Sequence, residues 1–335
     1  MNDRVETIKV KAAEADMRLD RWFRIHFPDV GYSYLQKLLR TGQVRVDSRR
    51  VEGNERLEAG ANIRVPKVVR TEKPLAAPSV KPPLGLSKAD RTSIERMILY
   101  EDEHILVLNK PFGLAVQGGS GTKRHVDGML AGMAERFGGE RPRLVHRLDR
   151  DTTGVLLIAK HRDAAAKLGR VFQTRSAAKT YWALVRGVPK PPQGKVDAAL
   201  VKAAGPEGDR VRKARPGEQE VAQSAVTYYA VVDRAGQEVA RLSLKPVTGR
   251  QHQLRAHMAI IGHPILGDEK YEGDRDLPEG IANKLHLHAR RISFPHPSGE
   301  GIVDVTAPLP DHMLASFAAF GFAEGDEADA GDGAL

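Results

Sequence analysis

The pattern of apolar and polar positions in the first seventy residues changes its period along the chain. Apolar residues at helical spacing follow Asp16, which is expected to cap the helix: Leu19, Trp22, Phe23 and Phe27. A second helix is expected from Ser33 to Gly42, a glycine typical of helix C-termini. Valine and isoleucine then alternate with polar residues around positions 44–46 and 63–65, as in strands. The pattern predicts a small helix–helix–strand domain.

The remainder of the chain combines many short strand patterns with fewer helical ones. Strands are expected at five apolar stretches, residues 105–108, 155–159, 181–185, 226–232 and 240–244. Helices are expected at residues 163–173 and 251–261. Because strands outnumber helices and do not alternate strictly with them, we expect an α+β domain whose sheet is largely antiparallel.

Composition divides the chain into four segments. Five prolines with few large apolar residues fall between Pro66 and Pro83, a composition that stays extended. The last twelve residues contain five acidic side chains and no basic one, which favours disorder. We therefore expect a small basic domain at 1–70, a linker at 71–92, a main domain at 93–320 and an acidic disordered tail at 321–335.

Charge and residue usage limit the classes of function. Lys and Arg number 52 against 43 Asp and Glu, a formal net charge of +9, which favours polyanionic partners such as nucleic acid. The absence of cysteine excludes disulfides, thiolate zinc sites and cysteine nucleophiles. With no apolar leader and no apolar run of membrane length, the protein is expected to be cytoplasmic, without a membrane partner.

Two polar runs stand next to elements of the expected core. The run HRLDRDTTG, residues 146–154, directly precedes the apolar strand at 155–159, where packing alone would favour apolar residues. The run TGRQHQLRAH, residues 248–257, begins at a glycine turn and enters the second expected helix. Its Arg255 could meet Asp149 across a cleft, which makes the pair a candidate site.

These runs resemble the signature motifs of the RluA-type pseudouridine synthases. Further matches lie in order along the chain: NKPFGL at 109–114, KTY at 179–181, GHPILGD at 262–268 and LHLHA at 285–289. The resemblance implies the pseudouridine synthase fold, a mixed, largely antiparallel sheet with a central cleft. It also implies the reaction, in which a uracil is detached from its ribose at N1 and rejoined through C5 without a cofactor.

The same resemblance implies roles for individual residues. Asp149 is placed as the catalytic carboxylate, Arg255 as the arginine that keeps it ionised, and Tyr181 as the tyrosine that stacks on the everted base. The implied substrate contacts are Arg147, which fills the space left by the base, and Leu254, which packs against the uracil, together with His146, Arg250 and His252. No metal ligand is implied, and the histidines lack the spacing of a metal site.

The segment LQKLLRTGQVRV, residues 35–46, resembles a small RNA-binding module shared by a ribosomal small-subunit protein and bacterial tyrosyl-tRNA synthetases. The RNA-binding residues expected from this likeness are Arg18, Arg21, Lys37, Arg40 and Arg45. A loop of the form GGSG at 118–121 resembles the subgroup that modifies large-subunit ribosomal RNA. The expected partner is therefore ribosomal RNA, and the family suggests a monomer.

Each assignment has a simpler alternative. Asp149 could cap the turn that follows it, and the letters RLDR also occur at residues 18–21, inside an amphipathic helix where their role is structural. Tyr181 could be a core aromatic residue and Arg147 a surface arginine. For the whole protein, the alternatives are a non-enzymatic RNA-binding or ribosome-assembly factor and a synthase that acts on transfer RNA.

Overall fold

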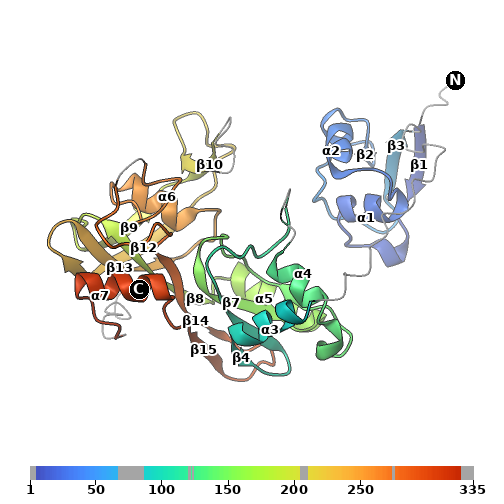
Figure 1. Cartoon of the computed structure of the whole chain (residues 1–335). Coiled ribbons are helices and arrows are strands. Elements are labelled where there is room, and N and C mark those ends of the chain that lie inside the picture. Colours follow the sequence, from blue (N-terminus) through green and yellow to red (C-terminus); the bar gives the residue numbers. More distant parts are fainter. Residues whose placement is uncertain are drawn as a thin grey trace. The chain divides into compact units, whose positions relative to one another are not determined.

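The computed structural model describes residues 5–66, 87–119, 122, 124–203, 210–273 and 276–325 (Figure 1). The chain forms two compact units that divide after Leu84. Most of the expected linker and the last ten residues of the expected acidic tail lie outside the described residues. None of the described helices is long and apolar enough to cross a membrane.

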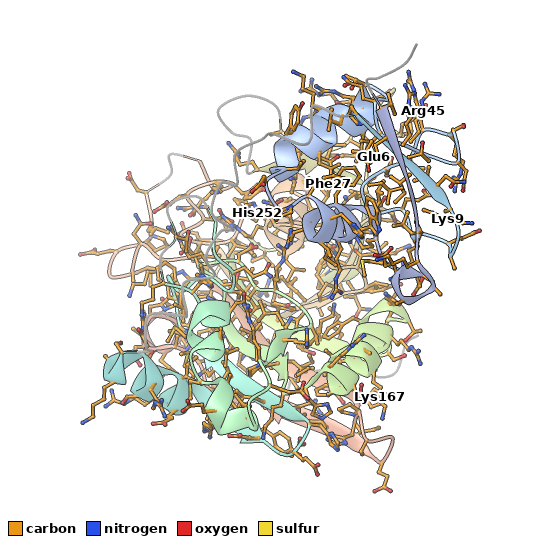
Figure 2. The ribbon with its side chains drawn as sticks, turned by 90° about the vertical axis from the view of Figure 1, so that its right-hand side faces the viewer. Glu6, Lys9, Phe27, Arg45, Lys167 and His252 are labelled. Carbon is orange, nitrogen blue, oxygen red and sulfur yellow. The ribbon has the colours of Figure 1, made fainter. Side chains whose placement is uncertain are left out.

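The N-terminal unit packs two short helices against a three-stranded sheet. Its elements are β1 (Val5–Lys9), a 3-10 turn (Ala12–Glu14), α1 (Leu19–His26), α2 (Tyr32–Arg40), β2 (Arg45–Val46) and β3 (Asn62–Pro66). The strand order is β1-β3-β2, and both neighbouring pairs are antiparallel. Apolar residues of both helices form its core with Ile63, and Figure 2 labels Phe27, one of these core residues.

Two features of this unit differ from the expectation. The strand β1 was missed, because its apolar positions are only half-buried and give a weak alternation. The expected cap at Asp16 is wrong, since α1 begins at Leu19 with Arg18 as its N-cap residue. Asp16 lies in the preceding turn with φ of 62°, where its amide donates to the carbonyl of Leu57.

The second unit is built on a ten-stranded mixed sheet. Its strands are β4 (Ile98–Glu101), β5 (Ile105–Lys110), β6 (Arg143–Leu144), β7 (Thr153–Ala159), β8 (Ala178–Arg186), β9 (Gln193–Asp197), β12 (Val226–Ala235), β13 (Val239–Pro246), β14 (Leu287–Pro295) and β15 (Ile302–Thr306). The main path runs β4-β5-β7-β14-β8-β13-β12-β9, with β15 on β14 and β6 on β7. Only β7 and β14 are parallel, which confirms the expected α+β class with a largely antiparallel sheet.

Helices cover both faces of this sheet. They are α3 (Lys88–Met97), α4 (Val126–Ala131), α5 (Arg162–Gln173), α6 (Gln253–Ile260) and α7 (Asp311–Phe320), with a 3-10 turn at Ala134–Phe137. Alternate residues of β5 and β7 face α3 and α4 on one side and α5 on the other. Along β8, Ala183 and Val185 face α6, while Trp182 and Leu184 face α7. A small hairpin of β10 (Leu200–Lys202) and β11 (Val211–Lys213) contacts α6.

The ends of the second unit extend into segments expected to be unstructured. Residues 87–92, expected within the linker, belong to α3 and its cap, where the hydroxyl oxygen of Ser87 accepts the amide of Asp90 at 3.0 Å. After α7, Phe322 is buried against Phe317, and Arg241 donates to the carbonyl of Ala323. Phe322 and Ala323, expected within the tail, thus contact the rest of the second unit.

The loop that carries Asp149 enters β7 at Gly154, which has φ of 104°. A Cβ atom there would lie 2.2 Å from the carbonyl oxygen of Ala289 on the paired strand β14. Only glycine allows this approach, so the start of β7 and the preceding loop are fixed against β14.

Replacing this glycine is expected to destabilise the fold. G154A forces a positive φ and a backbone clash, and should lower the free energy of unfolding by at least about 2 kcal/mol. G169A is the matched control, because Gly169 lies within α5 with free space at its Cβ position and should gain about 0.5–1 kcal/mol. Chemical denaturation of both variants measures the difference, and an unchanged G154A stability would contradict this description.

Candidate active site

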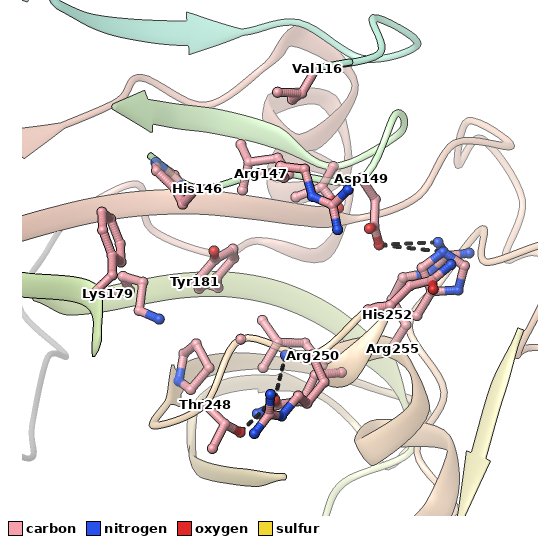
Figure 3. Close-up of a pocket in the computed structure, with 18 of the residues that line it drawn as sticks. Val116, His146, Arg147, Asp149, Lys179, Tyr181, Thr248, Arg250, His252 and Arg255 are labelled. Atoms are coloured by element: carbon pink, nitrogen blue, oxygen red, sulfur yellow. Dashed lines mark hydrogen bonds and ion pairs between the residues drawn. The ribbon is translucent and has the colours of Figure 1, made fainter. Parts of the chain in front are cut away.

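A pocket of about 990 Å³ lies where the loop before β7, the start of β8 and the loop into α6 meet (Figure 3). The expected site residues of the second unit all line it: His146, Arg147, Asp149, Tyr181, Arg250, His252, Leu254 and Arg255. The two sequence runs are thus brought together from opposite parts of the sheet. The expected RNA-binding residues Arg18, Arg21, Lys37, Arg40 and Arg45 lie in the N-terminal unit.

Asp149 and Arg255 face each other in the pocket. The NH1 group of Arg255 lies 3.4 Å from Oδ2 of Asp149, so the expected ion pair is present but long. The tighter partner of Arg255 is Asp268, whose two oxygens accept from Nε and NH2 at 2.7 Å each. The Asp149 side chain remains 28% exposed, whereas that of Asp268 is fully buried. Arg255 is therefore held by one carboxylate and presents its remaining donor to another that solvent and ligand can reach.

The charge of Arg255 is stabilised by this arrangement. Burial alone lowers its pKa, but the hydrogen bonds and the negative charges of Asp268 and Asp149 outweigh burial and hold the pKa above its ordinary value. Asp268 was not predicted as a site residue. Its signal was the GHPILGD run, which was recognised as a motif without a role for its final aspartate.

His252 and Tyr271 flank the ion pair. His252 has φ of 50° and its Nε2 lies 3.9 Å from Oδ2 of Asp149. Its Nδ1 is 3.1 Å from the hydroxyl of Tyr271, which also accepts the amide of Val211 at 2.8 Å. The guanidinium of Arg255 lies 5.3 Å from the centre of the Tyr271 ring, within cation–π range. Tyr271 was missed, since only tertiary structure brings it beside the motif.

The loop into α6 is held by its own polar side chains. Gln253 accepts through Oε1 from the hydroxyl of Thr248 at 2.6 Å and from the amide of Arg250 at 3.1 Å. The Nε of Arg250 donates to the carbonyl of Ser224 at 3.0 Å, so this arginine braces the turn. Leu254 is buried at the pocket wall. The network fixes the first turn of α6 and therefore the position of Arg255.

The residues before Asp149 have contrasting environments. Arg147 is exposed, and its guanidinium donates a long hydrogen bond of 3.4 Å to Oε1 of Gln117. His146 accepts the amide of Leu157 through Nε2 at 2.8 Å and stacks on Phe172. Burial and the charge of Lys179 lower the pKa of His146 to about 3, so its imidazole is neutral. His146 thus has a structural contact, while Arg147 is free to move to a ligand.

Tyr181 forms the part of the pocket wall contributed by β8. The residue is half-buried and packs against the apolar clusters under α4 and α6. Burial raises its pKa well above the ordinary value, and the negative charge of Asp149 adds to this effect. Its phenol is therefore neutral and can both donate and accept a hydrogen bond.

Lys110 lies beneath the Asp149 loop and is fully buried. Its ammonium donates to the carbonyls of Pro111, Leu114 and Arg150 at 3.0, 2.9 and 2.8 Å. Burial lowers its pKa to about 7, and the carboxylates of Asp151 and Asp149 oppose this shift. The sequence run NKPFGL contained Lys110 but gave no sign that it ties two motif loops together.

The histidines of the second unit that looked like possible ligands have ordinary partners. Those buried at the core bond hydroxyls: His257 contacts Thr227 at 2.9 Å, His286 contacts Ser316 at 2.8 Å and His288 contacts Thr153 at 2.8 Å. Within the described ranges, no three His, Asp or Glu side chains are grouped so that they could hold a metal ion.

Loss of the buried charge pair should cost far more than loss of an exposed one. D268N removes the tight partner of Arg255 and is expected to reduce the free energy of unfolding by about 3–5 kcal/mol, because it leaves a buried guanidinium poorly compensated. D304N breaks the ion pair between Asp304 and Arg291, whose side chains are 37% and 42% exposed, respectively. This substitution should lower the free energy of unfolding by about 0–1 kcal/mol. Urea unfolding of both variants tests this; equal losses would contradict the role given to Asp268.

Comparisons with known proteins identify the family of the chain. The family model of RNA pseudouridylate synthase matches residues 104–260. A protein named ribosomal large subunit pseudouridine synthase C from Vibrio vulnificus is 36% identical over 92% of this chain and 95% of its own, and that of Escherichia coli K12 is 37% identical over 92% and 94%. The solved structure of human RNA pseudouridylate synthase domain containing 4 has 32% identity and a TM-score of 0.58, covering 68% of this chain and 94% of its own. The chain therefore belongs to the RluA-type family of RNA pseudouridine synthases.

Proposed function

We propose that the protein converts specific uridines of large-subunit (23S) ribosomal RNA to pseudouridine, with Asp149 as the catalytic carboxylate. The substrate follows the printed names of relatives that align over nearly the whole chain. The observation that carries the proposal is the half-exposed Asp149 carboxylate opposite Arg255, itself fixed by Asp268. With ribosomal RNA as its substrate, the enzyme is proposed to act in the cytoplasm, and the family resemblance leads us to expect a monomer.

The chemistry requires a carboxylate that stays negatively charged. The bond between C1′ of the ribose and N1 of the uracil breaks, a bond between C1′ and C5 forms, and the C5 hydrogen leaves as a proton while N1 gains one. Asp149 can attack the sugar or base as a nucleophile, or remove a proton from the sugar, and both roles need its ionised form. The Arg255 guanidinium, which remains a cation, supplies the opposite charge beside it.

The target uridine must leave the RNA stack to reach Asp149, at a cost of a few kcal/mol. In the proposed complex the base stacks on Tyr181, whose neutral hydroxyl can relay a proton, and packs against Leu254. Arg147 can fill the vacated place in the RNA, since its guanidinium is exposed and its hydrogen bond to Gln117 is long. His252, at 3.9 Å from Asp149, lines the same side of the pocket.

The N-terminal unit would add charge contacts to the RNA backbone. Arg21, Lys37 and Arg40 are exposed side chains of α1 and α2. Arg18 and Arg45 have intramolecular partners, the carboxylate of Asp20 and the carbonyl of Gly42, and are expected to contribute less.

Substitution of the carboxylate tests the proposal directly. D149N keeps the shape of the side chain but removes its charge, so modification should fall by at least about 10³-fold if the residue is the nucleophile or base. Pseudouridine is mapped in the ribosomal and transfer RNA of cells that contain only this variant, beside wild-type and deletion strains. Retention of every modification would contradict the role of Asp149, and loss confined to transfer RNA would favour the transfer-RNA alternative.

Charge reversal on α2 tests the contribution of the N-terminal unit. K37E/R40E should weaken binding of large-subunit ribosomal RNA and make the affinity less dependent on salt, because fewer counterions are released. The rate at saturating RNA should remain unchanged. K88E, on the exposed first residue of α3, is the control. If K37E/R40E and K88E bind RNA equally, the N-terminal unit does not contact the RNA backbone through α2. If the wild-type protein binds naked RNA but does not modify it, the assembly-factor alternative is favoured.

A further inference from the structure

Lys179 is a half-buried cation of the pocket wall that the proposed mechanism does not use. Among the described residues, none lies within hydrogen-bond or ion-pair distance of its ammonium group. Burial lowers the pKa of Lys179, and no nearby carboxylate opposes that shift. A desolvated cation without a partner is unfavourable in the free protein, and an anionic ligand would compensate it.

Two other cations of the pocket are already compensated by carboxylates. Arg255 pairs with Asp268 and Asp149, and Arg150 pairs with Asp151 at 3.1 Å. Lys179 therefore differs from them in having its charge available to a ligand. The positive charge of Lys179 helps to lower the pKa of His146 and so to keep its imidazole neutral. His146 therefore offers Lys179 no negative charge.

Lys179 lies near the start of β8, where this strand borders the pocket. β14 pairs with β8 past Lys179 to Ala178, whereas the pairing of β13 with β8 ends at Leu244 opposite Tyr181. β13 itself continues to Pro246, and the chain then turns at residues 247–249 towards α6. Residues 246–249 line the pocket together with Lys179, so the pocket extends beside the start of β8.

Lys179 and Tyr181 lie on the same face of β8, two residues apart, while Thr180 and Trp182 between and after them are buried (Figure 3). This spacing separates their Cα atoms by about 7 Å, which is comparable to the length of one nucleotide of RNA backbone. If the everted uracil stacks on Tyr181, the group that reaches Lys179 belongs to the adjoining sugar–phosphate chain.

We propose that Lys179 forms a phosphate subsite, binding the backbone phosphate next to the everted uridine. The inference rests on the proposed function, in which that uridine occupies the pocket. A neutral uracil would bring no negative charge to the ammonium, whereas each phosphate brings one. Arg175, an exposed arginine that also lines the pocket, supplies a second cation for the RNA backbone.

The salt dependence of RNA binding separates this role from a structural one. K179M, K179R and the control K88M are compared for binding a transcript of large-subunit ribosomal RNA at about 50–200 mM salt, each with D149N so that the RNA stays unmodified. K179M should bind about tenfold more weakly near 100 mM salt, with a salt slope smaller by about 0.7–0.9, while K179R and K88M keep the wild-type slope. If K179M does not fold, K179Q is measured in its place. Equal slopes for all variants would overturn the proposal.

A neutral linkage in the RNA then locates the phosphate. A stem–loop with one uridine that the protein modifies is made with a 2′-deoxy methylphosphonate at each neighbouring position, beside the matching 2′-deoxy phosphate. At one position within two nucleotides of the uridine, the neutral linkage should weaken RNA binding about tenfold for the protein that keeps Lys179. The same linkage should hardly change RNA binding by the K179M variant. Additive effects at every position would overturn the proposal. Modification retained by D149N would instead contradict only the proposed function, since these slopes are read from binding.

Discussion

The site depends on the buried ion pair between Arg255 and Asp268. Two hydrogen bonds of 2.7 Å fix the plane of the guanidinium in a place where neither side chain can be solvated. A buried pair of this kind contributes little net stability, but either partner alone would be costly. The consequence is geometric: the donor that remains on Arg255 points to Asp149, so the carboxylate at the mouth of the pocket faces a fixed positive charge before any RNA is bound.

The fold places the two halves of this arrangement from different directions. Asp149 lies on a loop held from below by the hydrogen bond from Lys110 to the carbonyl of Arg150, and at its end by the close approach of Gly154 to Ala289. Arg255 lies on the first turns of α6, which the side chain of Gln253 ties to the start of β12. Both loops are thus rigid, whereas Arg147 and Lys179 at the walls keep side chains that a ligand can engage.

Much of this could be predicted from the sequence. Apolar runs with clear periods predicted β7, β8, α5 and α6. The density of charge beside a core strand drew attention to residues 146–154, and the family resemblance assigned the catalytic role to Asp149. Asp268, Tyr271 and Lys110 escaped prediction because their roles are contacts between distant segments, which no local pattern contains. The cap at Asp16 failed for a local reason, since a turn with positive φ separates it from the helix. Lys179 was part of a recognised motif, but only the structure shows that it lines the pocket without an ion-pair partner among the described residues.

The most direct test of the account is a crystal structure of the protein with an RNA whose target uridine carries fluorine at C5. Because the hydrogen at C5 must leave as a proton, fluorine there should stop the reaction with the nucleotide still in place. The account predicts an everted base in the pocket, against Tyr181 and within reach of the Asp149 carboxylate, with Arg255 still paired to Asp268. A base that remains stacked in the RNA, or one bound away from Asp149, would contradict it.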